Sequence, residues 1–162
     1  NNTYKPSNPI SDEEYLGTEK YNSAKDNELA SDEIQNNEVY QLSYNIIADS
    51  YNSPNDYDKY KDVISKDDFE ILIPYDINEK EKTDFSDTEY FYKFCIFELK
   101  FTDEKAIVSY EFQCYKYDKK DCRKTKLVTS DSCYNPVRIY FAYNDGKWKV
   151  DHIYDPPWIR NV

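Results

Sequence analysis

The chain has 162 residues, enough for one domain that buries about 70% of the surface its unfolded chain exposes. One third of the residues are charged and the formal net charge is −11. This balance argues against nucleic-acid binding, because phosphate contacts need a clustered basic face. Two glycines in the whole chain exclude glycine-rich phosphate loops, and no run of about 18 apolar residues is present to span a membrane.

The core is expected to be rich in aromatic rings. Leu, Ile, Val and Phe together number 34 of 162 residues, close to the level of disordered chains. The 18 tyrosines and 2 tryptophans compensate, because each aromatic ring buries about 150–250 Å².

Cysteine usage favours an extracellular protein. The four cysteines are Cys95, Cys114, Cys122 and Cys133. An even count with no C-x-x-C motif and one histidine favours two disulfides over a zinc site, with free buried thiols as the alternative. The lack of methionine predicts that a leader has been removed, as in an exported protein or a surface-attached lipoprotein. The excess of Asn, Lys, Ile and Tyr over Ala, Gly and Arg is typical of AT-rich codons, and hence of a low-GC Gram-positive bacterium.

Residues 1–30 are expected to form a partly ordered stalk or tether, and residues 31–162 a single α+β domain. The start of the chain is polar, contains proline and has no apolar periodicity. Within this segment, residues 11–14 have the Ser-x-x-Glu form of a capping box and predict a short helix. Residues 1–88 carry 21 acidic and 8 basic side chains, whereas residues 89–162 carry 11 and 13.

Two helices are predicted after the tether. Ser31 caps a helix of about five turns, in which apolar residues recur at helical spacing from Val39 to Tyr51. Pro54 opens the second helix, whose apolar face is formed by Tyr57, Tyr60, Val63 and Ile64. Residues 69–88 fit no single element.

From Tyr90 the apolar period changes to two, which predicts strands. Residues 90–101 and 106–114 form an antiparallel hairpin, residues 122–129 a third strand, and a fourth strand begins at Pro136. Asp145-Gly146 is the strongest turn signal in the chain. The expected class is therefore α+β, with N-terminal helices packed on a curved antiparallel sheet of four to six strands.

The register of the last hairpin follows from its turn. Tyr143 then faces Trp148, Phe141 faces Val150, Ile139 faces His152, and Val137 faces Tyr154. All these side chains share one face, so His152 is expected to point into the body of the protein.

The final hairpin resembles that of the nuclear-transport-factor-2-like (cystatin-like) cone fold. The residues that carry the resemblance are Val137–Tyr143 and Asp145–Val150, with a Gly-Lys-Trp core. The resemblance implies a cone whose concave sheet face, covered by helices, forms a pocket. The disulfides and the Asn-rich start look like those of exported Gram-positive members of unknown function. Because such folds serve isomerases, dehydratases, binding domains and secretion or conjugation subunits, the fold alone does not choose a function.

Three sets of candidate site residues follow. The first is an acid/base site at His152 with Tyr110 or Tyr154, for which a structural core histidine is the favoured alternative. The second is a partner surface on the outer face of the sheet, where tyrosines are expected to be exposed: Tyr90, Tyr92, Tyr115, Tyr117 and Tyr140. The third is a pair of disulfides, Cys95–Cys114 and Cys122–Cys133. No metal site and no cofactor are expected.

The leading hypothesis is an extracellular or cell-surface domain, non-enzymatic, that binds a protein or a small ligand. Membrane contact is expected through an N-terminal anchor alone. The alternatives are a small-molecule isomerase or dehydratase with a pocket around His152, and an envelope subunit of a secretion or conjugation machine.

Overall fold

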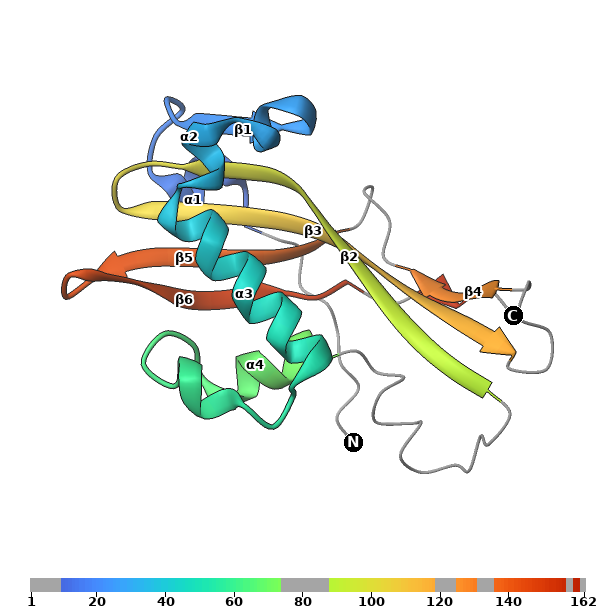
Figure 1. Ribbon diagram of the computed structural model, residues 1–162. Coiled ribbons are helices and arrows are strands. Elements are labelled where there is room, and N and C mark those ends of the chain that lie inside the picture. The colour runs from blue at the N-terminus through green and yellow to red at the C-terminus, as the bar shows by residue number, and fades with distance from the viewer. Residues whose placement is uncertain (1–9, 74–87, 119–124, 131–135, 157–158, 161–162) are drawn as a thin grey trace.

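The fold is known from a computed structural model (Figure 1). The structure describes residues 10–73, 88–118, 125–130, 136–156 and 159–160, and of residues 88–92, 114–118, 125–130 and 159–160 it describes the backbone alone.

Helices precede most of the strands along the described chain. The helices are α1 (Asp12–Leu16), α2 (Asp32–Gln35), α3 (Glu38–Asn52) and α4 (Lys66–Leu72), with 3-10 helices η1 (Asp26–Ala30) and η2 (Tyr57–Tyr60). The strands are β1 (Asn22–Lys25), β2 (Thr88–Phe101), β3 (Lys105–Asp118), β4 (Thr125–Ser130), β5 (Val137–Asn144), β6 (Lys147–Tyr154) and β7 (Ile159–Arg160).

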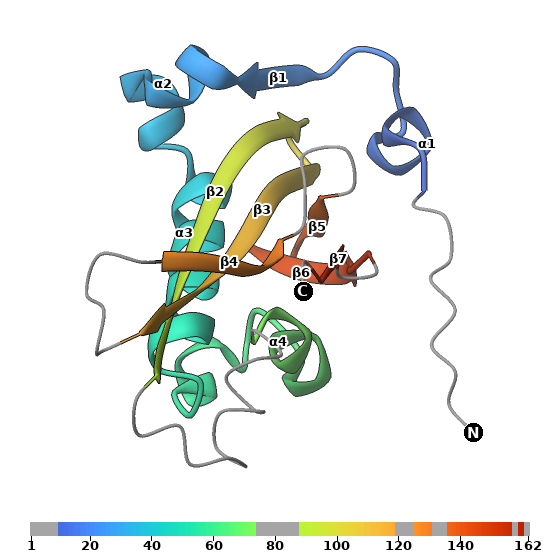
Figure 2. The same ribbon diagram turned by 90° about the vertical axis from the view of Figure 1, so that its right-hand side faces the viewer.

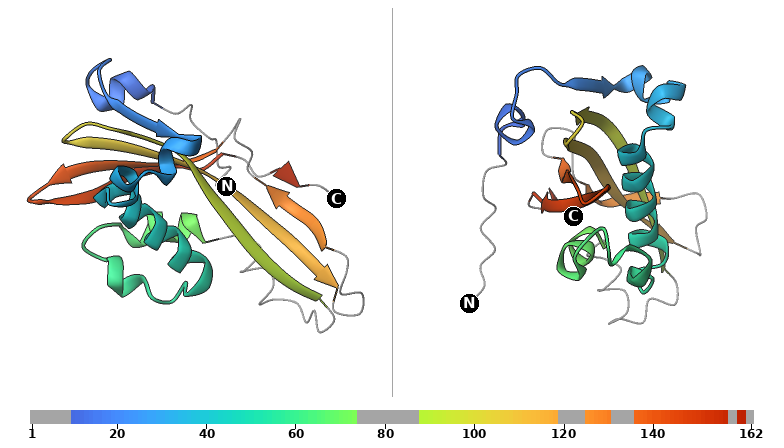
Figure 3. Two further views of the ribbon diagram at one scale, coloured as in Figure 1. Left: turned by 45° about the horizontal axis from the view of Figure 1, so that its top comes forward. Right: turned by 90° about the vertical axis from the view of Figure 1, so that its left-hand side faces the viewer.

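All the described strands belong to one antiparallel sheet with β3 at its centre. β3 pairs with β2 along its whole length, with β5 through residues 105–110 and with β4 through residues 113–117. The left view of Figure 3 shows β2 and β3 running on past β5 and β6 toward β4. The predicted α+β class with a curved antiparallel sheet is confirmed. The short strands β1 and β7, which were not predicted, bring the described strands to seven.

Helices contact both faces of the sheet. α3 and α4 cover the inner face, and α1 lies against the outer face, as Figure 2 and the right view of Figure 3 show. The core lies under α3 and α4, and alternate positions of β3 are buried there, as the apolar period of two predicted: Ala106, Val108, Tyr110 and Phe112. The Asp145-Gly146 turn is also confirmed, with positive φ at both residues.

The predicted helix from Ser31 is divided into α2 and α3. Ser31 Oγ accepts the N–H of Ile34, as expected, but α2 ends after Gln35. Asn37 then caps α3, because its Oδ1 accepts the N–H groups of Val39 and Tyr40 at 2.9 and 3.1 Å.

The predicted helix from Pro54 to Ile64 is wrong. Residues 57–60 form one 3-10 turn, and the next α-helix, α4, begins only at Lys66. Ser65 caps α4 through the N–H of Asp68, and Tyr57 donates to the carbonyl of Ile64, which holds the intervening turn. The tyrosines of the expected helix face pack on the core instead from this irregular segment.

Residues 12–30 belong to the folded domain, so the expected boundary at residue 31 needs correction. β1 pairs with β2, and Leu16, Ala24 and Leu29 are buried. Ser11 Oγ caps α1 by accepting the N–H of Glu14, as the capping box predicted. Residues 1–9 lie outside the described part of the chain.

Two β-bulges reverse the faces of strands β2 and β6. Phe97 is the extra residue in β2, and Asp151 is the extra residue in β6. Between the turn and the bulge at Asp151, the predicted register of β5 with β6 is confirmed, because Tyr143 pairs with Trp148 and Phe141 with Val150. Beyond it the register is shifted by one residue, and each side chain changes face.

Candidate functional site

His152 lies on the outer face of the sheet, contrary to the predicted register. The bulge at Asp151 pairs His152 with Tyr140 and pairs Ile139 with Ile153. The imidazole stacks on the ring of Tyr140 at a centroid distance of 4.2 Å, and Tyr15 of α1 meets its edge at 5.6 Å. Its Nδ1 lies 2.9 Å from Asp151 Oδ2, and 36% of the side chain is exposed. The expectation of a core histidine is therefore wrong.

The structure separates the residues named for an acid/base site. Tyr110 is 2% exposed and lies in the core on the inner face, so it cannot meet His152. Tyr154 shares the outer face, where it packs beside Leu16 and Tyr140. His152 lines none of the four depressions of the described surface that are presented below.

The tyrosines around His152 hold α1 on the sheet. Tyr15 donates its hydroxyl to the carbonyl of Phe141 at 3.0 Å, and Tyr140 donates to the carbonyl of Ile10 at 3.4 Å. Burial, aided by the nearby Asp151 carboxylate, raises the pKa of Tyr15. Burial also raises the pKa of Tyr140, although Arg138 acts in the opposite direction. The hydroxyls of both tyrosines therefore stay protonated at neutral pH, and the two side chains act as packing and hydrogen-bonding groups.

An ion cluster fixes the start of α1 beside this aromatic group. Asp12 lies 2.5 Å from Lys100 Nζ and 3.2 Å from Arg138 Nη1, and its side chain is 16% exposed. Burial lowers the pKa of Lys100, but its hydrogen bond to Asp12 and the charges of Glu98 and Asp12 outweigh burial, so the pKa is raised. The charged groups where α1 meets the outer face are thus paired with one another within the domain.

This contact also corrects the predicted tyrosine surface. Tyr140 was expected to be exposed on the outer face; it does lie on that face, but it is buried beneath α1. The side chains of Tyr90, Tyr92, Tyr115 and Tyr117 lie outside the described part of the structure.

The predicted disulfide between Cys95 and Cys114 is wrong. The tight turn after Phe101 and the bulge in β2 place Cys95 opposite Glu111, while Cys114 lies opposite Tyr92. Three residues along a strand separate the two positions by about 10 Å, beyond the roughly 7 Å limit for the Cα atoms of a disulfide. Cys95 is free and lies at the surface. Partial burial of its thiol, together with the charge of Glu111, raises the thiol pKa. Cys122 and Cys133 lie outside the described residues.

The depressions of the described surface include four open ones, of which one differs in its chemistry. Charged side chains line three of them: Lys20 and Asp103 in one, Glu28 and Glu33 in the second, and Asp103, Glu104 and Lys105 in the third. The fourth, here called the α3 groove, has a volume of about 480 Å³ and is lined by Gln35, Tyr40, Gln41, Tyr44 and Asn45. Its lining carries no charge, in a chain that is 33% charged.

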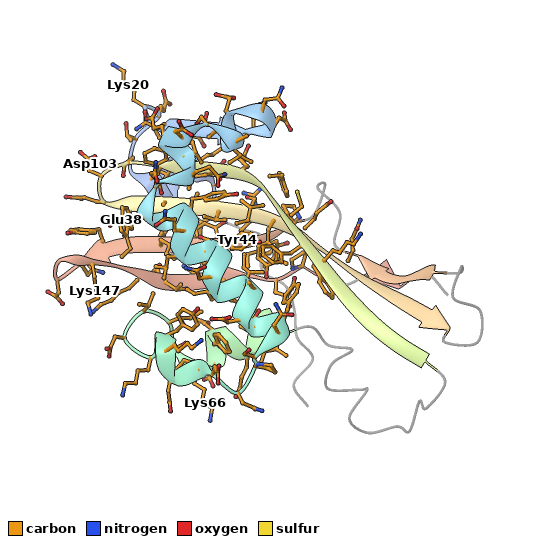
Figure 4. All side chains as sticks on the ribbon, in the orientation of Figure 1. Lys20, Glu38, Tyr44, Lys66, Asp103 and Lys147 are labelled. Carbon is orange, nitrogen blue, oxygen red and sulfur yellow. The ribbon has the colours of Figure 1, made fainter. Side chains whose placement is uncertain are left out.

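Local contacts position the side chains of the α3 groove. Gln35 Nε2 donates to the carbonyl of Leu29 at 2.7 Å, and Gln41 Nε2 donates to the carbonyl of Gln35 at 3.0 Å. Tyr44, labelled in Figure 4, is 51% exposed, and its ring packs on Phe94 of β2 at 5.1 Å. Phe94 in turn meets the rings of Tyr51 and Tyr110 in the core. The groove is therefore a surface site with an aromatic support beneath it.

The sequence-based search missed this groove, although it carries a signal. Residues 39–48 contain no charged side chain, and four of them are Tyr, Gln or Asn. Helical spacing of apolar residues identifies the buried face of this helix, whereas the groove lies on its exposed face.

Within the described residues, no His, Cys, Asp and Glu side chains form a group of three or more that could hold a metal ion. The helices of this part of the chain all fall short of the length and apolar character needed to cross a membrane. Comparisons of the chain with models of protein families, with curated proteins and with solved structures gave no match.

Proposed function

We propose that the chain is a non-enzymatic binding domain and that the α3 groove is its binding surface. The observation that carries the proposal is the exposure of uncharged tyrosine and amide side chains on a helix whose other face is anchored in the core. Tyrosine gives a large contact area at a small entropic cost, and amides supply adaptable hydrogen bonds. A volume of about 480 Å³ lies within the usual range of ligand sites.

The inner face of the sheet supports a binding role rather than a catalytic one. In the cone fold that the final hairpin resembles, this face lines the pocket. Here aromatic rings fill the space under α3: Tyr51, Phe94, Tyr110 and Phe112 meet there at centroid distances of 5.4–6.4 Å. We infer a scaffold of the nuclear-transport-factor-2-like (cystatin-like) kind that has a closed interior and binds through its exterior.

Export to the cell surface is the second part of the proposal. It is supported by the even cysteine count of the chain. The free Cys95 weakens the disulfide argument, so this part now depends on Cys122 and Cys133.

Footprinting of exposed tyrosines tests the binding surface. Tyr44 and Tyr143 are exposed to similar extents, 51% and 42%, and among the described residues each has a ring neighbour, at 5.1 and 5.4 Å. Both should be iodinated in the purified protein. On the cells that produce the protein, Tyr44 should be protected and Tyr143 should not. Equal labelling of Tyr44 in both settings would overturn the assignment of the α3 groove as the binding surface.

A further inference from the structure

The α3 groove presents its chemistry in two parallel columns. Tyr40 and Tyr44 are four residues apart on α3, as are Gln41 and Asn45, and such pairs are neighbours on a helix surface. An aromatic column therefore runs beside an amide column, and Gln35 extends the amide side beyond the start of α3.

The amides and hydroxyls of the groove retain hydrogen-bonding capacity. Each glutamine uses one N–H group for a backbone carbonyl, which leaves its Oε1 and a second N–H available. Among the described residues, the hydroxyls of Tyr40 and Tyr44 and the side-chain amide of Asn45 have no hydrogen-bond partner. The groove thus offers both donors and acceptors to a ligand.

The lining excludes several ligand classes. Without Lys or Arg it has no partner for a phosphate or carboxylate, and without Asp or Glu it has none for a cation. It also lacks Trp and Arg, which together with Tyr dominate the energetic centres of protein interfaces. What remains is a neutral ligand with C–H faces for the rings and many hydroxyl groups for the amides.

We propose that the α3 groove binds a neutral carbohydrate chain, with Tyr44 stacking on a sugar ring and Gln41 and Asn45 bonding to sugar hydroxyls. This inference rests on the proposed function, since it assigns a ligand class to the same surface. The contacts of Gln35 and Gln41 with the backbone, and of Tyr44 with Phe94, fix the lining before the ligand arrives. Such preorganisation lowers the entropic cost of binding.

Titration calorimetry with defined oligosaccharides tests the ligand class. The probes are the neutral hexasaccharides of cellulose, xylan, amylose and chitin, with an oligogalacturonide as the charged comparison. At least one neutral hexasaccharide should bind, and the oligogalacturonide should not. Tyr44→Ala should weaken binding by about tenfold, as expected for the loss of one ring contact.

Three further variants make the result specific. Tyr44→Phe retains the ring and should bind almost as well as the wild type, and Asn45→Ala, which does not disturb the Phe94 contact, should also weaken binding. Tyr143→Ala, at an exposed tyrosine outside the groove, should have no effect. Absence of binding to every neutral probe, or binding that Tyr44→Ala and Asn45→Ala leave unchanged, would overturn the carbohydrate assignment. If Tyr44 is nevertheless protected on cells, the groove binds a protein instead, and the proposed function stands without this ligand.

Discussion

Asp12 is the anion shared by two cations of the sheet. Its carboxylate contacts Lys100 and Arg138, whose side chains are 19% and 26% exposed. Exposed ion pairs contribute little to stability, whereas removing one member of a buried cluster leaves the remaining charges uncompensated. The Asp12 cluster lies between these limits, so Asp12 is expected to contribute to the contact between α1 and the sheet beside the tyrosines.

Replacing Asp12 with Asn should lower the free energy of unfolding by about 2 kcal/mol, between the values for exposed and buried pairs. Urea denaturation measures the change. The matched control is Glu14→Gln, which removes an exposed charge from the same first turn of α1 and should have an effect below about 0.5 kcal/mol. Equal effects of the two variants would show that the cluster does not hold α1.

The raised pKa of Lys100 predicts a pH dependence of stability. Because the folded pKa lies above the unfolded value of about 10.4, the ion pair contributes fully below that value. The contribution is lost as the pH rises through the folded pKa. The difference in melting temperature between the wild type and Lys100→Gln should therefore be large at pH 8 and should shrink at about pH 11.5. A difference that stays constant would contradict the assignment, since the other titrating groups are the same in both proteins.

At the scale of the elements, the bulge in β6 decides which side chain enters the core. Ile153 packs against the main core cluster, and His152 lies among the rings on the outer face. A regular register would exchange these positions. The bulge therefore places the histidine where α1 covers part of it.

Two alanine substitutions test the bulge. Ile153→Ala should cost about 2 kcal/mol, since it removes a partly buried aliphatic side chain. His152→Ala should cost about 1 kcal/mol, the usual value of an aromatic contact. Chemical denaturation of both variants measures the two losses in the free energy of unfolding. A larger loss for His152→Ala would support the regular register instead.

The alternation of apolar residues predicted the buried faces of the strands in segments that no β-bulge interrupts. Alternation identified the buried positions of β3 and the pairing next to the Asp145-Gly146 turn. Alternation assigns the wrong faces beyond Phe97 and Asp151, because the extra residue of each bulge reverses the faces of its strand. The amino-acid composition gives no sign of these bulges. The short strand β1 was missed for a different reason, since its sequence NSAK has little β-propensity and is held by β2.

The candidate site was less predictable than the fold. Parity correctly placed Tyr140 on the outer face, but its burial depends on α1, which lies far away in the sequence. The α3 groove has a local signal in its uncharged residues, yet the ring that supports Tyr44 belongs to Phe94, a residue of a distant strand. Contacts between distant segments are the part that a single sequence does not show.

For the molecule as a whole, the redox state of the cysteines bears on the compartment. Without reduction, iodoacetamide should modify Cys95 in the folded protein, and peptide mapping should show Cys122 joined to Cys133. Burial and the Glu111 carboxylate raise the pKa of the Cys95 thiol, so Glu111→Gln should increase the rate of its modification by iodoacetamide at pH 8. Cys95→Ser, as the control, should abolish this modification. A linkage of Cys95 to Cys114 would contradict the register of β2 with β3.

The place of α1 in the fold has a consequence for the order in which the chain is assembled. Tyr15 and Asp12 each contact a residue 126 positions further along the chain, Phe141 and Arg138. Contacts of such separation form slowly, because a long loop must close first. During synthesis, α1 therefore leaves the ribosome early, but its docking site on the sheet is incomplete until β5 has emerged. The residues made near the beginning are among the last to reach their native positions, and until then the outer face of β5 stays uncovered.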